Sequence, residues 1–316
     1  MFELLGPAIS VSANVLLIWS GLRAWRIRNA FLKWGGVSLA AVLSTVATAI
    51  SVLLVVGLFK LHARTAPAVA LKISPTPEQI QRGEEISNGF CSSCHSKTGT
   101  LTGGNNIGED LPLPLGAFVS SNLTPAGPLS RWSDGEIFRA IRNGVDRDGG
   151  WLMIMSYTNA GKLSDDDTKA VIAYLRQLSP AGQPTPNPPD RLNPLGVLML
   201  GAGMLPTGKP VSDDTITAPA KAPTALYGEY ILSYQDCREC HGKDLTGGVP
   251  GQLGPLGPDL HLVKDWKLEE FIATMRNGVD PNGHEIGKQM PWKPIGRMSD
   301  EELAAIYEYL THLPNT

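Results

Sequence analysis

Two short stretches of the same pattern hold all four cysteines of the chain, "CSSCH" at 91–95 and "CRECH" at 237–241. Cysteines at this spacing lie one helical turn apart, which suits zinc sites and dithiol redox sites alike. A histidine directly after the second cysteine is instead typical of c-type haem attachment, in which the thiols bond the haem and the imidazole binds its iron. Because this histidine follows both pairs, we expect two covalently bound haems, with a four-cysteine zinc site or a dithiol pair as the alternative. The candidate haem-binding residues are Cys91, Cys94, His95, Cys237, Cys240 and His241.

The 316 residues have a net charge of −3 that is unevenly distributed along the chain. Residues 1–75 hold seven Lys or Arg and one acid, whereas residues 224–316 hold eight Lys or Arg and fourteen acids. Nothing in this distribution resembles a nucleic-acid-binding surface. The basic part is also the most apolar part, which indicates a membrane.

Two uncharged apolar stretches, 4–22 and 35–59, are each long enough to cross a bilayer. The loop between them carries Arg23, Arg26, Arg28 and Lys33 and no acid, so the positive-inside rule predicts that it is cytoplasmic. We therefore expect a two-pass anchor in the inner (plasma) membrane of the cell, with everything after it on the periplasmic side, where haem attachment also takes place. The alternative is a signal segment cleaved at "APAVA" (66–70), but the preceding apolar run is longer than a signal core of about 7–15 residues.

The remainder of the chain is an internal repeat. "RNGVD" occurs at 142–146 and 276–280, and "LTGG" follows each cysteine motif, at 101–104 and 245–248. The repeat predicts two versions of one small helical domain. Four residues with the same place in both copies are further candidates for cofactor binding: Trp132, Trp266, Arg142 and Arg276.

The helices of each copy can be placed from local signals. Gly83 and Gly228 hold matching positions, and we expect the last helix of each copy to cross the first helix there, packing Tyr174 in one copy and Tyr307 or Tyr309 in the other. Ser or Thr followed three residues later by an acid or amide predicts helix starts at Thr76, Ser133, Ser164 and Ser299.

A Pro-rich connector separates the two copies and cannot be a regular helix or strand. Its apolar run "PLGVLMLGAGMLP" is too short to span a bilayer, and we expect it to pack on the haem domains, with a partner-facing patch as the alternative. The methionines of this run, Met199 and Met204, are expected in the core. The expected domains are a transmembrane hairpin at 1–64, a first haem domain at 65–180, the connector at 181–223 and a second haem domain at 224–316.

On these motifs the chain resembles membrane-anchored di-haem cytochromes c of class I. The stretch "SNLTPAGPLSRWSDGEIFRAIRNGVDRDGG" and the later "MSY" are similar to the cytochrome c subunits of membrane-bound alcohol and sugar dehydrogenases. Those subunits carry three haems, however, and usually an anchor at the far end. The di-haem subunits of cbb-type oxidases share the haem count and the N-terminal spans, but their inter-segment motif is missing here. The resemblance implies an all-α fold, with a two-helix transmembrane hairpin before two tandem class I cytochrome c domains.

The resemblance also implies an axial methionine opposite each histidine. Met155 and Met290 match the distal ligands because each precedes a small residue and an aromatic, with Met153 in reserve. His261 and His284 could instead give the second haem two histidines, but neither has a counterpart in the first copy. In the family a proline carbonyl accepts the N–H of the proximal imidazole; Pro258 matches that proline, and Pro114 is its counterpart in the first copy.

Irons closed by histidine and methionine exchange electrons but do not readily bind a substrate. We therefore expect an electron relay without catalytic activity of its own, in a respiratory or photosynthetic electron-transfer complex. Its partners would be the lipid bilayer, other subunits of that complex and a soluble electron carrier. The alternatives are a di-haem peroxidase-like enzyme, which needs an open iron, and a haem-based sensor or structural subunit.

Overall fold

A computed structural model describes residues 2–97, 99–252 and 255–314, with the backbone alone for residues 2–10. The described chain is mostly helical, as expected, and its two short strands, β1 (Gly116–Phe118) and β2 (Asp190–Leu192), pair with each other. It divides into two compact units. The α-helices are α1 (Phe2–Ala24), α2 (Ala30–Ala63), α3 (Pro77–Ile86), α4 (Ser92–His95), α5 (Asp134–Asn143), α6 (Met153–Tyr157), α7 (Asp165–Leu175), α8 (Pro194–Gly201), α9 (Ala225–Tyr234), α10 (Cys237–His241), α11 (Leu268–Asn277), α12 (Trp292–Ile295) and α13 (Asp300–Thr311).

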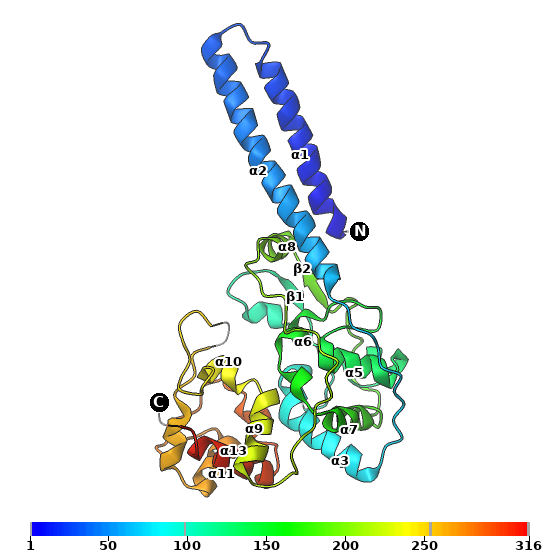
Figure 1. Cartoon of the computed structure of the whole chain (residues 1–316), viewed down its shortest axis with the longest axis vertical. Helices are drawn as coiled ribbons and strands as arrows, with labels where there is room; N and C mark the ends of the chain where they lie inside the picture. The colour runs from blue at the N-terminus through cyan, green and yellow to red at the C-terminus, as the bar shows by residue number, and fades with distance from the viewer. Residues whose placement is uncertain (1, 98, 253–254, 315–316) are drawn as a thin grey trace. The chain divides into compact units, whose positions relative to one another are not determined.

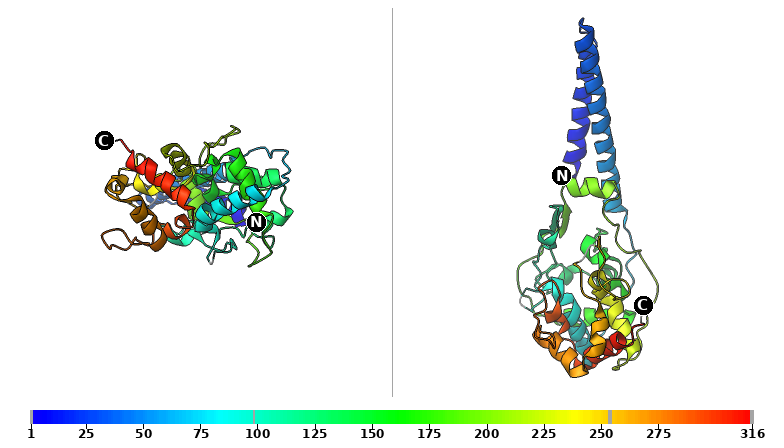
Figure 2. Two further views of the ribbon diagram at one scale, coloured as in Figure 1. Left: turned by 90° about the horizontal axis from the view of Figure 1, so that it is seen from below. Right: turned by 90° about the vertical axis from the view of Figure 1, so that its left-hand side faces the viewer.

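The first unit contains α1 and α2, together with the segments Gly108–Ala117 and Asp190–Gly208. The two long helices lie side by side (Figure 1 and the right-hand view of Figure 2). Small residues allow the close approach, since a Cβ on Gly36 would lie 2.9 Å from that of Ala24. Asn14 also joins the helices by bonding Ser44 and Thr48, and such polar contacts stabilise helix pairs in apolar surroundings.

Among the described residues, α2 is the one helix that is both long enough and apolar enough to cross a membrane. The apolar part of α1 that can be assessed, Val11–Ala24, is shorter. The expected first span, 4–22, falls partly on residues 4–10, whose side chains lie outside the described part of the structure. The fold therefore shows one candidate span, and the second span stays a prediction.

The apolar run of the connector forms α8, which packs on α2 within the first unit. A Cβ on Gly57 would lie 2.1 Å from the carbonyl oxygen of Val197, and one on Gly201 would lie 1.9 Å from that of Leu53. Lys60 donates to the Leu200 carbonyl at 3.0 Å, which places a cation at the C-terminal end of α8. The expectation that this run packs on the haem domains is wrong, because glycines on both helices let α8 approach α2 closely. Met204 is 68% exposed, so its expected place in the core is wrong as well.

The second unit contains both copies of the repeat. Helices α3, α5, α6 and α7 of the first copy correspond to α9, α11, α12 and α13 of the second. The predicted caps are present, because Thr76, Ser133, Ser164 and Ser299 each accept a hydrogen bond from the backbone N–H three residues later. The irregular segments repeat too, since isolated bridges join Val145 to Trp151 and Val279 to Glu285.

In each copy the last helix crosses the first at a glycine. A Cβ on Gly83 would lie 1.9 Å from the Ala170 carbonyl oxygen, and one on Gly228 would lie 1.9 Å from that of Ala305. The tyrosine at the second crossing is Tyr309, whose Cβ lies 2.9 Å from that position. The crossing predicted from the sequence is confirmed in both copies.

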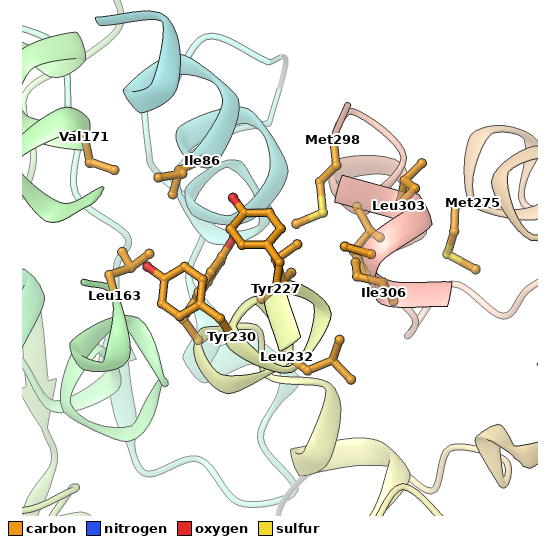
Figure 3. Packing of buried hydrophobic residues seen from close by; sticks show 14 of the residues in the cluster. Ile86, Leu163, Val171, Tyr227, Tyr230, Leu232, Met275, Met298, Leu303 and Ile306 are labelled. Carbon is orange, nitrogen blue, oxygen red and sulfur yellow. The ribbon is translucent and has the colours of Figure 1, made fainter. Parts of the chain in front are cut away.

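The two copies share one hydrophobic core. Figure 3 shows Tyr227 and Tyr230 of α9 between Ile86 and Leu163 of the first copy and Leu303 of the second. Tyr227 is 2% exposed and Leu303 is fully buried. The copies are thus packed against each other, and the core of one is completed by side chains of the other.

The crossing at Gly228 gives a stability test. Gly228→Ala should lower the free energy of unfolding by roughly 1–3 kcal/mol or more, because the added methyl group overlaps a helix backbone that cannot move away. Chemical denaturation followed by circular dichroism measures this change. Gly287→Ala is the matched control, since a Cβ there meets no atom within 4 Å, and an equal effect of both substitutions would contradict the close crossing.

Candidate functional site

Both cysteine pairs lie on one turn of helix with the histidine directly after them. Cys91 ends a π-helical turn (Ser87–Cys91) that runs into α4, and Cys237 opens α10. All four thiols are free and half-buried. Burial raises the thiol pKa of Cys91 and of Cys237 to about 12, whereas reactive dithiols have a lowered pKa. Among the described residues, no three His, Cys, Asp or Glu side chains gather as a metal ion would require. The raised thiol pKa does not favour the dithiol alternative.

The two histidines are held in the same way. His95 Nδ1 lies 2.8 Å from the Ser121 carbonyl oxygen, and His241 Nδ1 lies 2.8 Å from the Pro258 carbonyl oxygen. A carbonyl only accepts, so each Nδ1 carries the proton and each Nε2 keeps a free lone pair. Burial, only partly offset by the bond to Ser121, lowers the pKa of His95 and favours the neutral ring. Each motif therefore presents two thiols and one metal-binding nitrogen, which fits covalent haem with a proximal histidine.

In the first copy the carbonyl that accepts the imidazole N–H belongs to Ser121, not to Pro114 as expected. Pro114 lies in a segment that clusters with α2 and α8, and its carbonyl accepts a hydrogen bond from Asn193. Between His95 and Ser121 the chain leaves the haem-domain unit, because Gly108–Ala117 belongs to the unit of α2 and α8. Counting residues from the motif therefore selected the wrong carbonyl. No sequence signal marks Ser121, because any residue supplies a backbone oxygen.

A strained loop follows each histidine. Leu101 and Leu245 have φ angles of 54° and 63° and are the described non-glycine residues with positive φ. This left-handed conformation costs roughly 1–2 kcal/mol per residue, and both leucines are buried and hold the same place in the repeat. Two residues further on, Gly103 N–H donates to the His95 carbonyl and Gly247 N–H donates to the His241 carbonyl. The loops thus fix the backbone of both histidines.

The structure separates the methionines into two groups. Met155 and Met290 are half-buried, in α6 and just before α12. Met153 is 3% exposed and Met298 is 2% exposed. Met298 packs on Gly89 of the first copy, where a Cβ would lie 2.9 Å from its Cγ, so it is a core residue.

The histidines that could have replaced a methionine have other partners. Both ring nitrogens of His261 are bound, to Asp259 at 2.7 Å and to the Pro314 carbonyl at 2.9 Å. His284 lies on the surface, with Nδ1 3.0 Å from Asp280. Neither arrangement favours a second histidine at the second haem.

The repeated arginines tie each middle helix to the segment before the last helix and to the first residue of that last helix. Arg142 donates to the Gly161 carbonyl and to Asp165, at 2.8 and 2.7 Å. Arg276 donates to the Gly296 carbonyl and, at 2.7 Å, to Asp300. Because Met155 and Met290 lie in the segments that these bonds close, both arginines can hold the methionine loops in position.

The repeated tryptophans precede the middle helices and are partly buried. The Trp132 carbonyl accepts a bond from Arg176, and the Trp266 carbonyl accepts one from Tyr307. A cavity of about 280 Å³ lies beside Trp132, and its lining includes Ser121 and Leu152. The cavity thus reaches the residue whose carbonyl holds His95.

The segments that carry the two motifs touch each other. Gln235 Nε2 donates to the Gly89 carbonyl at 3.3 Å, and the rings of Phe90 and Tyr234 meet edge to face with 5.7 Å between their centroids. Arg82, between the last helices of both copies, also joins the copies. Sequence reasoning did not find these contacts, because no local pattern reports which surfaces of the two copies meet.

The support of His241 gives a test of the second site. Gly257→Ala would place a Cβ 2.7 Å from His241 Nδ1, so the ring should be displaced from the Pro258 carbonyl. We expect the covalent haem to be retained, since the cysteines are unaffected, and the low-spin optical and paramagnetic resonance signals of that haem alone to change. Gly287→Ala is the control. Unaltered signals in Gly257→Ala would show that this support does not fix the ring.

Comparisons with known proteins agree with this geometry. Residues 80–179 match the family described as cytochrome c, and residues 218–310 match the family described as cytochrome C oxidase, cbb3-type, subunit III. A nicotinate dehydrogenase subunit of Pseudomonas putida is 30% identical, over 74% of this chain and 21% of that protein. The cytochrome c subunit of alcohol dehydrogenase (quinone) of Gluconacetobacter polyoxogenes is 26% identical, over 74% of this chain and 56% of that relative. The gluconate 2-dehydrogenase cytochrome c subunit of Pantoea cypripedii is 32% identical, over 27% of this chain and 22% of that relative. The chain thus spans little more than half of the second relative's length and less of the others.

Proposed function

Since the chain carries a cytochrome c domain and a cbb3-type cytochrome domain, which imply covalently bound haem c, we propose that it holds two haems and relays single electrons. The observation that carries the proposal is the duplicated arrangement of each motif. In both copies a pair of thiols lies on one helical turn, and a neighbouring imidazole gives its Nδ1 proton to a backbone carbonyl. The haem iron supplies the redox chemistry by changing its oxidation state by one electron.

Each haem would be held by residues of one copy. The thiols of one motif would form the thioether bonds, and the histidine would bind the iron through Nε2. Met155 and Met290 would close the opposite sides, with Arg142 and Arg276 holding their loops, while Trp132 and Trp266 would line the sites. A closed iron keeps its ligands in both oxidation states, so little in the protein has to move when an electron arrives or leaves.

We assign the chain to a membrane-bound dehydrogenase complex as its electron-transfer subunit. The relatives named as cytochrome c subunits of alcohol and gluconate dehydrogenases support this assignment. Other subunits of the complex would deliver electrons, and a soluble carrier or a further membrane complex would accept them. We propose a respiratory role, which the relatives named as dehydrogenase subunits support.

The anchor would be α2, joined by α1 as a second crossing in the inner membrane. Trp25 and Trp34 meet edge to face at the turn between the helices, and Lys33 lies 4.1 Å from the Trp25 ring centroid, a composition that suits a membrane interface. The basic loop would face the cytoplasm and the haem copies the periplasm. We retain 1–64, 65–180, 181–223 and 224–316 as the proposed domain boundaries.

The haem content and the methionines test the relay. The wild-type chain should carry two covalent haems in a pyridine haemochrome assay and should not bind carbon monoxide when reduced. Met290→Ala should open one site to carbon monoxide, and Met155→Ala should open the other. Met290→His should keep the haem closed and lower its midpoint potential, because imidazole favours the oxidised iron more than thioether does.

Met298→Leu is the matched control for these variants, because it changes a core methionine while conserving volume, and it should leave both spectra unchanged. If Met155→Ala is silent and Met153→Ala opens the first site, the ligand is Met153. If the wild-type protein binds carbon monoxide stoichiometrically, an open iron is present, which contradicts the relay and revives a peroxidase-like or sensing function.

The topology has its own test. Protease added to right-side-out membrane vesicles should remove both haem copies, and it should cut the Arg23–Lys33 loop only after the vesicles are permeabilised. Peptide mapping by mass spectrometry locates the cleavages. Haem copies that survive in intact vesicles while the loop is cut would reverse the orientation. An N-terminus that, like the loop, is cut only after the vesicles are permeabilised would leave α2 as a single span.

A further inference from the structure

The two haem-attachment segments meet where each one enters its cysteine motif. Phe90 directly precedes Cys91, and Tyr234 lies three residues before Cys237. The rings of Phe90 and Tyr234 are in edge-to-face contact with their centroids 5.7 Å apart. A side-chain bond from Gln235 to the Gly89 carbonyl, 3.3 Å long, runs beside the ring pair. Phe90 is therefore one residue from the Cys91 sulfur, and Tyr234 is three residues from the Cys237 sulfur, the two sulfurs that would bond the haems.

The junction continues on the far side of the motifs. Asn159, in the loop after α6, donates to Asp236 from its backbone N–H at 2.9 Å and from its side chain at 2.8 Å. The Asp236 carboxylate also lies close enough to Cys94 to raise the pKa of that thiol, although burial is the larger cause. Residues beside Cys91 and the loop after α6 thus both contact the segment that opens the second motif.

Tyr234 contributes its ring and not its hydroxyl. It is 1% exposed, and its hydroxyl has no hydrogen-bond partner among the described residues. Burial raises the pKa of this phenol well above its usual value. A tyrosine that is oxidised in a relay must release its proton to an acceptor, and no such acceptor is bonded here. The Tyr234 ring, like that of Phe90, therefore acts only by filling the space between the two segments.

Electron tunnelling slows steeply with distance and with every gap in packing, so the densest connection between two redox groups dominates their exchange. We propose that the contact between Phe90 and Tyr234 is the place where electrons cross between the two haem sites of the chain. The proposal rests on the proposed relay function. This electron transfer is balanced within the chain: one iron is oxidised as the other is reduced. No proton, bond or third reactant is involved.

Electron exchange in the half-reduced, full-length protein in detergent tests the proposal. Proton NMR of the haem methyl resonances gives the exchange rate between the two haems, and the part that does not depend on protein concentration is intramolecular. Phe90→Leu and Tyr234→Leu should each lower this rate several-fold, and the double variant should lower it further. Tyr234→Phe should leave the rate unchanged, since it removes only an unpartnered hydroxyl.

The control for general loosening is Tyr230→Phe, which removes the 2.6 Å hydrogen bond to Asp167 between the copies and keeps the Phe90–Tyr234 contact. Melting temperature, haem content and the two midpoint potentials are measured for every variant. An unchanged rate in folded Phe90→Leu, whose side chain is only half-buried, would overturn the proposal, as would an equal slowing in Tyr230→Phe. Potentials and haem content that stay normal in such variants would leave the relay intact while removing this route.

Discussion

The arrangement of the two copies depends on one partly buried cation, the guanidinium of Arg82. The Arg82 guanidinium binds both carboxylate oxygens of Asp167, at 2.8 and 3.0 Å, and lies 2.5 Å from the carboxylate of Glu302. These acids occupy the same position in the two copies, in the first turn of α7 and of α13. One guanidinium thus joins the starts of both last helices, where acids are also favoured by the helix dipole. Removing one partner of a buried ion pair costs about 3–5 kcal/mol, because it leaves the remaining charge buried and unpaired.

The same cluster shows how a duplicated domain can pack against its own copy. Arg82 directly precedes Gly83, and the residue that directly precedes Gly228 is Tyr227. Two arginines at these matching positions would bring like charges together in a dry interface. The second copy instead has an aromatic ring, whose centroid lies 6.0 Å from the Arg82 guanidinium carbon. The repeat is therefore symmetric in its helices and asymmetric where the copies meet.

Features that depend on neighbouring residues were predictable from the sequence. Helix caps such as Thr76 and Ser299 need only the next three residues, and a glycine crossing follows from aligning the copies. Features that depend on contacts far apart in the chain were not. The packing of α8 on α2 was missed because an apolar helix face can fit several surfaces. The Ser121 carbonyl was missed as the acceptor of His95 because a segment of the other unit, Gly108–Ala117, lies between these residues in the sequence. The ligation by Met155 and Met290 and the cofactor roles of the repeated arginines and tryptophans stay predictions.

The packing of the two copies covers the segment that leads into the first cysteine motif. Gly89 lies under Met298 of the other copy, and Phe90 lies against Tyr234, so the chain on the N-terminal side of Cys91 is covered once the copies have packed. Burial also raises the pKa of the Cys91 thiol to about 12, which makes its thiolate form scarcer than that of an exposed cysteine. Packing of the second copy therefore covers the segment beside this thiol, while Cys91 itself stays half-buried. If haem is attached before the copies pack, the finished interface then covers the segment beside the new linkage.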